Sequence, residues 1–240
     1  MDLTAPPMLE ALLQSRAAEG WGGLWHGVYP AVVVDIKDPD SQGRVKVRLP
    51  WSPDAAGAPC ELWARLATLM GGDNRGSWFI PDVDDEVLVA FEAGHAFRPY
   101  VIGALWNGHD SPPESMDASG RNDKKVIRSR NGVKLILDDQ DGQEQFIVET
   151  PGGQKVTLKD GPGSVELRDS NGNTVRLETA GVTIVASTKV TVQASQVSVS
   201  ASTVQVDAGM STFSGVVKAD TVLCNSIISA SYTPGAGNIW

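Results

Sequence analysis

The sequence predicts an all-β protein in which a small barrel is followed by an intertwined trimeric β-helix, with one short helix at the N-terminus. Residues 28–107 hold several short strand-like runs separated by turns that contain Gly and Pro, as in small barrels. Residues 182–208 repeat the pattern Val-x-Val-x-Ala, with Ile184 as the second residue of the first copy, at intervals of eight and then seven residues. Valine and isoleucine are stiff side chains that favour strands over helices.

The N-terminal arm, residues 1–27, is expected to contain the helix. Thr4 can cap its start, and the two prolines that follow suit a first turn. One face is apolar, and the Gly-rich run at 20–23 ends the pattern. We leave open whether this helix docks on its own chain or on a partner.

The barrel is predicted over residues 28–110. The sequence clearly indicates its first hairpin. The turn 38–43 contains Pro and Gly, and charged and apolar residues alternate in the following strand, Arg44–Leu49. This alternation is typical of a strand with one dry and one wet face. Further strands are expected at Leu62–Leu66, Glu86–Phe91 and Tyr100–Trp106.

A polar segment with prolines, residues 111–130, is interpreted as a linker. The β-helix is predicted from residue 131 to residue 212. Short strand-like pieces recur in its first half, and turn sequences such as Asp-Gly and Asn-Gly separate them.

The repeat at 182–208 predicts a core that three chains share. A coiled coil would space its apolar positions alternately by three and four residues, whereas here the spacing is two, two and three. One strand every seven or eight residues is too little to complete a coil of a single-chain solenoid, which needs about 20 residues. Three chains winding together would supply one side each. The predicted trimer-core residues are Val182, Ile184, Val190, Val192, Val197, Val199, Val204 and Val206.

Charge and composition exclude several classes of protein. The net charge of −9 lies entirely in residues 1–120, since the Lys/Arg and Asp/Glu residues of 121–240 cancel. No basic patch is present to bind nucleic acid. No stretch approaches 18 consecutive apolar residues, and the N-terminus does not resemble a secretion signal. We therefore expect the chain to fold in the cytoplasm of the cell that makes it.

Four motifs in order resemble the baseplate assembly protein V and VgrG-like spike family of contractile injection systems. Asp38–Trp51 (DPDSQGRVKVRLPW) is similar to the signature of the family's OB-fold domain. Leu62–Thr68, Arg75–Phe91 and Arg98–Asn107 follow in the family's order, and Ile127–Asp139 resembles the entry into the spike. Asp84 and Asp85 stand where the family commonly has a Gly in the turn. About 27 residues precede the OB region, so the resemblance is to short forms without a fused hub domain.

The resemblance implies a structural spike and not an enzyme. As a homotrimer it would bind the hub protein of a baseplate through its OB end, puncture the target envelope with its β-helical end, and contact the target membrane transiently. A tip protein of the PAAR type is a further possible partner. The spike would belong to a virion tail or an injection particle, and the residues do not distinguish a phage from a secretion system or a free particle. The alternatives are a receptor-binding tail fibre or adhesin stalk, and a polysaccharide-degrading tail spike.

The tip or cap region, residues 213–240, breaks the repeat. Tyr232, Ile239 and Trp240 are expected to cover the end of the spike or to offer an apolar platform to a cap. Cys224 is the weak metal candidate, since a trimer brings three thiols near its axis; a buried apolar role is the alternative. The three histidines share no ligand spacing, and no cofactor is expected.

Overall fold

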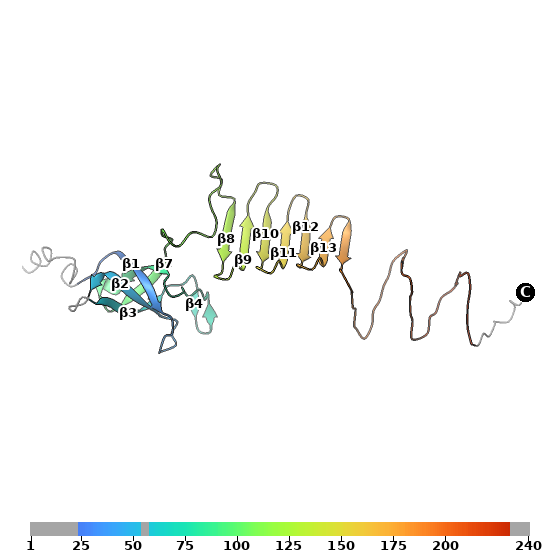
Figure 1. The fold of residues 1–240 in the computed structure, drawn as a ribbon, viewed down its shortest axis with the longest axis horizontal. Helices are drawn as coiled ribbons and strands as arrows, with labels where there is room; N and C mark the ends of the chain where they lie inside the picture. Colours follow the sequence, from blue (N-terminus) through green and yellow to red (C-terminus); the bar gives the residue numbers. More distant parts are fainter. Residues whose placement is uncertain (1–23, 54–57, 231–240) are drawn as a thin grey trace, which may run out of the picture. The chain divides into compact units, whose positions relative to one another are not determined.

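The computed structural model describes residues 24–53 and 58–230 of the 240-residue chain. Five strands close the barrel in the order β1-β2-β3-β7-β6, and β6 pairs back with β1 (Figure 1). All neighbours are antiparallel except β3 and β7, which run parallel. The barrel strands are β1 (Val28–Asp35), β2 (Val45–Pro53), β3 (Pro59–Leu66), β6 (Glu86–Phe91) and β7 (Pro99–Ala104).

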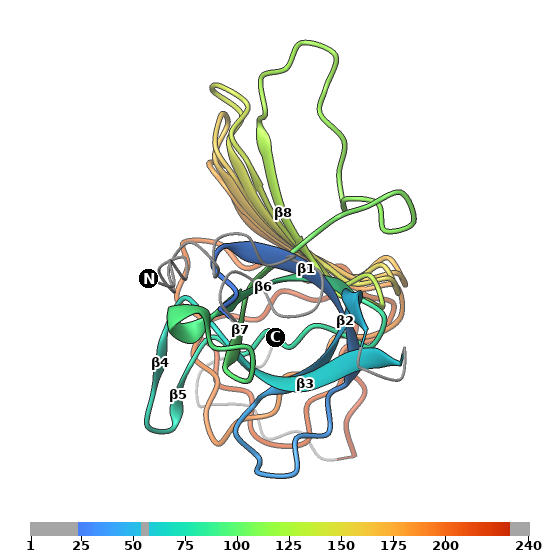
Figure 2. The same ribbon diagram turned by 90° about the vertical axis from the view of Figure 1, so that its left-hand side faces the viewer.

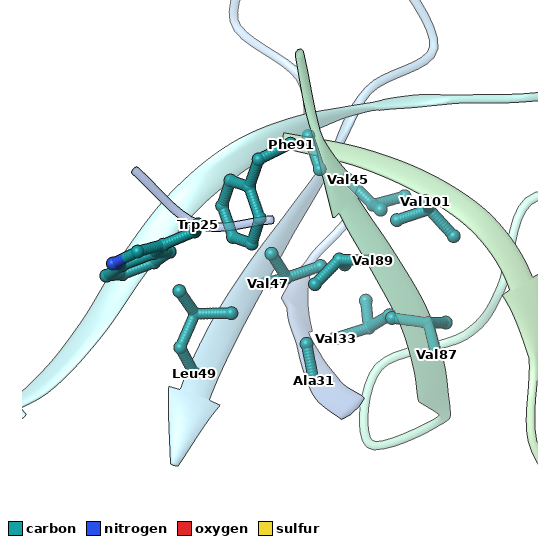
Figure 3. Close-up of a cluster of buried hydrophobic side chains, with 11 residues drawn as sticks. Trp25, Ala31, Val33, Val45, Val47, Leu49, Val87, Val89, Phe91 and Val101 are labelled. Atoms are coloured by element: carbon teal, nitrogen blue, oxygen red, sulfur yellow. The ribbon is translucent and has the colours of Figure 1, made fainter. Parts of the chain in front are cut away.

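The barrel buries a core of small aliphatic side chains, shown in Figure 3. Alternate residues of a strand point to the same side of a sheet. On β2 these residues are Val45, Val47 and Leu49, all fully buried, and on β6 they include Val87 and Val89. On β2 the inward row is apolar and the outward row carries Lys46 and Arg48, which is the alternation that the sequence predicts for the first hairpin.

Aromatic side chains extend this core at one place on the barrel. Tyr29 stacks on Trp51 with ring centroids 4.6 Å apart, and Trp25 meets Phe91 edge-on at 4.9 Å. The indole Nε1 of Trp51 donates a hydrogen bond of 2.7 Å to the carbonyl oxygen of Pro30. Such edge-on and stacked pairs add to area burial.

The turn between β1 and β2 is organised by one carboxylate. Asp38 accepts hydrogen bonds from the backbone N–H groups of Gln42 (2.7 Å) and Arg44 (3.2 Å) and an ion pair from the Arg44 guanidinium (2.6 Å). The Arg44 guanidinium, with these backbone donors, holds the pKa of Asp38 well below its ordinary value. Gly43 has φ of +71° and lies against the Trp78 ring, so a side chain there would be strained and crowded.

Two minor elements occur between the barrel strands. The strands β4 (Gly71–Gly72) and β5 (Arg75–Gly76) form a small hairpin in the connection from β3 to β6. The 3-10 turn η1 (Glu92–Gly94) joins β6 to β7.

The second sheet is an antiparallel meander of seven five-residue strands that pair in chain order. In Figure 2 its strands lie almost one behind another. The strands are β8 (Lys124–Arg128), β9 (Lys134–Asp138), β10 (Gln145–Glu149), β11 (Lys155–Lys159), β12 (Ser164–Arg168), β13 (Thr174–Glu178) and β14 (Gly181–Val185).

Three turns that join strands at the same end of this sheet have the same conformation. Each spans five residues, at 129–133, 150–154 and 169–173, and its first backbone N–H bonds to the carbonyl oxygen of its last residue. The fourth residue is always a glycine with φ between +84° and +88°. Only glycine adopts this conformation without strain, so the recurring Gly fixes where each strand ends.

Beyond Val185 the described chain contains no regular strand. Residues 190–230 form a unit of their own, separate from the described residues up to Lys189. The trace of residues 190–230 consists of extended segments that reverse direction repeatedly, as Figure 1 shows in brown and red. Its apolar side chains are exposed, since a single chain offers them no second layer.

The helix predicted at residues 4–19 of the N-terminal arm lies outside the described residues. The segment 111–130, interpreted as a linker, includes the strand β8, which begins at Lys124. Among the residues described, no helix has the length and apolar character needed to cross a membrane.

Candidate functional site: an apolar assembly face

One face of the second sheet is apolar from end to end. Residues paired directly across an antiparallel sheet share a face. The register therefore places the second and fourth residues of all seven strands on one face. Lys125 is its single polar member. The apolar members are Ile127, Leu135, Leu137, Phe146, Val148, Val156, Leu158, Val165, Leu167, Val175, Leu177, Val182 and Ile184.

This apolar face is open in the single chain. Phe146 is 40% exposed, Leu158 45% and Ile184 61%, although each is a large apolar side chain on a regular strand. A contiguous apolar area of this kind on a soluble chain marks an interaction surface. A sheet with one apolar face also needs a second layer to form a stable core.

The opposite face of the sheet is of a different kind. It carries charged pairs such as Lys134 with Glu149, whose atoms lie 3.3 Å apart, and Arg176 with Glu178 at 3.1 Å. Its apolar members are Ile147, which is 9% exposed, together with Val126, Ile136 and Val185. The contrast identifies the Ile127–Ile184 face as the side that requires a cover.

The structure divides the eight residues predicted for the trimer core into two groups. Val182 and Ile184 lie on β14 and belong to the apolar face of the sheet. The other six lie in the segment without strands and are 59–72% exposed. The first valine of each later repeat is 59–63% exposed and the second is 72% exposed in every case, so each repeat has the same local environment. These six are Val190, Val192, Val197, Val199, Val204 and Val206.

The strand alternation in the sequence also indicates the part of the apolar face between Ile127 and Leu177, which was not predicted as core. The eleven apolar residues from Ile127 to Leu177 were not predicted as core, although segments such as KLILD and KVTLK alternate strictly. The repeating unit is a pair of five-residue strands with turns that contain Gly, and this unit recurs about every 20 residues. That longer period is less visible than a seven-residue repeat of Val and Ala.

A polar network marks the end of the regular sheet. Asn173 Oδ1 accepts hydrogen bonds from the backbone N–H (2.9 Å) and the hydroxyl (3.2 Å) of Ser187. Asn173 Nδ2 in turn donates to Asp169 at 2.7 Å. The hydrogen bond from Asn173 Nδ2, with that from the backbone N–H of Asn173, lowers the pKa of Asp169. The network anchors the chain as it leaves β14 for the repeat.

The barrel carries a second candidate surface in the connection around the β4–β5 hairpin. Leu69 is 98% exposed, Trp78 76% and Phe79 67%. The Thr68 hydroxyl donates to the Ser77 carbonyl oxygen at 2.7 Å, which holds the two sides of this connection together. Exposed aromatic side chains on a rigid support are typical anchors for a protein partner.

No three His, Cys, Asp or Glu residues within the described ranges are grouped to hold a metal ion. Cys224 is exposed in the single chain. Tyr232, Ile239 and Trp240, predicted to cap the tip, lie outside the described residues.

These features define a protein with a closed five-strand barrel and a β-rich assembly region. Residues 29–106 match the family described as the type VI secretion system/phage-baseplate injector OB domain. Residues 145–210 match the phage baseplate V C-terminal trimerisation domain, which includes most of the apolar face and the repeat. The two matches together cover more than half of the chain, and the chain belongs to the baseplate V and VgrG-like spike family.

Curated relatives agree with this assignment. The chain is 28% identical over 144 residues to the type VI secretion system spike protein VgrG1b of Pseudomonas aeruginosa, covering 55% of this chain and 19% of the relative. It is 30% identical over 139 residues to VgrG1a of the same organism, covering 53% and 22%. For VgrG3 of Vibrio cholerae the identity is 30% over 115 residues, covering 45% and 11%. The match thus spans about a fifth or less of these relatives' length.

Proposed function

We propose that the chain is the trimeric structural spike of a contractile injection system, with no catalytic role. The observation that carries the proposal is the continuous apolar face from Ile127 to Ile184, which the repeat of exposed valines to Val206 follows in the sequence. Three copies around one axis would cover this face in every copy at once. The match of residues 145–210 to a trimerisation domain supports the same arrangement.

The mechanical role follows from the properties of such a shared core. Strands that pair between chains leave few open edges, and an apolar interior joins the copies along their length. Such a shaft transmits an axial push without a hinge between layers. The β-helical end would therefore lead into the target envelope, with transient contact to the target membrane, when the machine contracts.

The barrel is proposed to bind the hub of the machine. All the net negative charge lies in residues 1–120, which favours electrostatic steering toward a basic partner. Trp78 and Phe79 provide exposed anchors. At the other end, residues 213–240 are proposed as the tip or as the seat of a PAAR-type tip protein, with Tyr232, Ile239 and Trp240 as its apolar members. The producer's cytoplasm is the proposed site of assembly.

Cysteine cross-linking tests the shared core. In a C60S/C224S background, Val192→Cys places a thiol on the proposed inner side, and Gln193→Cys is the matched control on the other side of the chain. Oxidation should link two chains of each Val192→Cys trimer and leave Gln193→Cys unlinked. Equal cross-linking of the two variants, or none in either, would refute the proposed face.

A deletion tests the assignment of the ends. Removing residues 231–240 should leave hub binding intact and impair puncture of target envelopes or recruitment of a tip protein. If the deletion abolishes hub binding while the barrel stays folded, the two ends are assigned wrongly.

A further inference from the structure

The last described part of the chain differs from the repeat before it. In 182–208 apolar residues alternate with mostly polar ones, such as Thr191 and Gln193. Residues 213–230 instead contain adjacent apolar pairs. Neighbouring side chains of an extended chain point to opposite sides, so each pair places one apolar side chain on either side of this segment. The pairs are Val216–Val217, Val222–Leu223 and Ile227–Ile228.

The exposures separate the two members of each pair. Val217, Val222 and Ile227 are 62–69% exposed, within the range of the valines in the repeat. They are spaced five residues apart and continue the side that the trimer would share. Their neighbours touch almost nothing of their own chain: Val216 is 98% exposed, Leu223 99% and Ile228 98%. A trimer that covers the first set leaves the second set on its outer surface.

The spacing of the inner residues also changes. In the repeat, equivalent inner residues are seven residues apart, and each chain would form one side of the three-chain shaft with these seven residues. Val217, Val222 and Ile227 are only five residues apart. Two residues fewer shorten an extended side by about 7 Å. A three-chain shaft built on the shorter period is therefore narrower at this end.

We propose that Val216, Leu223 and Ile228 from three chains form an apolar collar that enters the hydrocarbon layer of a membrane. This proposal rests on the trimer proposed above. The occupant is lipid because residues 211–230 hold only one Lys and one Asp, Lys218 and Asp220, and so offer little charge for pairing with a protein partner. Aliphatic side chains such as Leu, Ile and Val are the ones that hydrocarbon accepts favourably.

The outer surface of the earlier repeat has no such character. Its outward positions are Thr191, Ser198 and Ser200 and similar polar residues, which gain nothing from hydrocarbon. The collar thus restricts lipid contact to the narrow end of the spike. It also accounts for apolar residues that the shared core does not use.

Lipid insertion of the purified full-length trimer is the direct test. A neutral phosphatidylcholine monolayer and vesicles of the same lipid serve as probes, so that electrostatic attraction plays no part. The variant V216S/L223S/I228S should remain trimeric and lose at least tenfold in vesicle partitioning, because nine apolar side chains per trimer are removed. The control T191S/S198T/S200T alters three outward positions without changing polarity and should behave like the wild type. The single variant Leu223→Ser should show an intermediate loss.

The outcomes separate this inference from the proposed function. A wild-type trimer that inserts no better than the triple-serine variant overturns the collar and leaves the spike proposal standing. Loss of the trimer in both V216S/L223S/I228S and Leu223→Ser would show that these residues face inward, which also overturns the collar. A wild-type chain that is not trimeric would instead contradict the proposed function.

Discussion

The barrel and the repeat solve the same problem, burying apolar side chains, in opposite ways. Val47 and Val89 of the barrel are fully buried within one chain, whereas Val192 and Val199 of the repeat are each 72% exposed. Both regions are rich in valine on extended backbone. The difference is that the barrel sheet is closed, because its strand β6 pairs with β1. Beyond Val185, the described repeat forms no strand pairing within one chain. A closed sheet is complete as a monomer, and an open winding requires further copies.

The largest expected effect comes from a charge on the open side of the repeat. Val199→Asp would place three carboxylates near one axis without partners, which destabilises assembly by several kcal/mol. Light scattering should show loss of the trimer with an intact barrel. Ser200→Asp, on the other side of the chain, is the matched control and should assemble normally. Equal assembly of the two variants would mean that the face is assigned wrongly.

A cavity in the barrel should have a smaller and strictly local effect. Leu49 is fully buried, and Leu49→Ala is expected to destabilise the barrel by about 2–5 kcal/mol. Tryptophan fluorescence follows barrel unfolding, because Trp25, Trp51 and Trp63 lie in this region. The repeat should still assemble. A variant that keeps the barrel folded but is monomeric would show that the two regions are not independent.

The sequence predicted the barrel well because its alternation and turn residues are local signals. The hairpin around 38–43 and the strand Glu86–Phe91 appear where expected. The parallel pairing of β3 with β7 was not predictable, since Arg65 and Tyr100 lie far apart in sequence. The apolar face from Ile127 to Leu177 was missed because single strands of five residues carry a weak signal. Register across all seven strands is needed to see them as one surface.

Removal of a polar side chain at the junction where the chain leaves β14 should have a moderate effect on the stability of the spike. Asn173 accepts two hydrogen bonds from Ser187 and donates one to Asp169. Asn173→Ala removes these bonds and should lower spike stability by about 1–3 kcal/mol per chain. Thermal unfolding of the trimer measures the change, with Asn171→Ala in the same turn as a milder control. No difference between the two would show that the junction contributes nothing beyond an ordinary turn.

The smallest expected effect is the loss of barrel stability at acidic pH. The pKa of Asp38 is lowered in the folded barrel by the Arg44 guanidinium, so the unfolded carboxyl binds a proton more readily than the folded one. The stabilisation is complete above the ordinary pKa of 3.8 and declines as the pH falls below it. Barrel melting temperature should therefore fall on acidification, and Asp38→Asn should flatten this dependence. An unchanged slope in Asp38→Asn would assign the acid sensitivity to other carboxylates.

The mass of the purified chain in solution tests the central claim most directly. Light scattering at micromolar concentration should give three times the chain mass of 25.4 kDa, with no folded monomer. A shared core predicts that this mass persists on dilution until the spike unfolds. A folded, soluble monomer under these conditions would contradict the account, because the apolar face from Ile127 to Ile184 and the exposed valines of the repeat would then be stable in water without a cover.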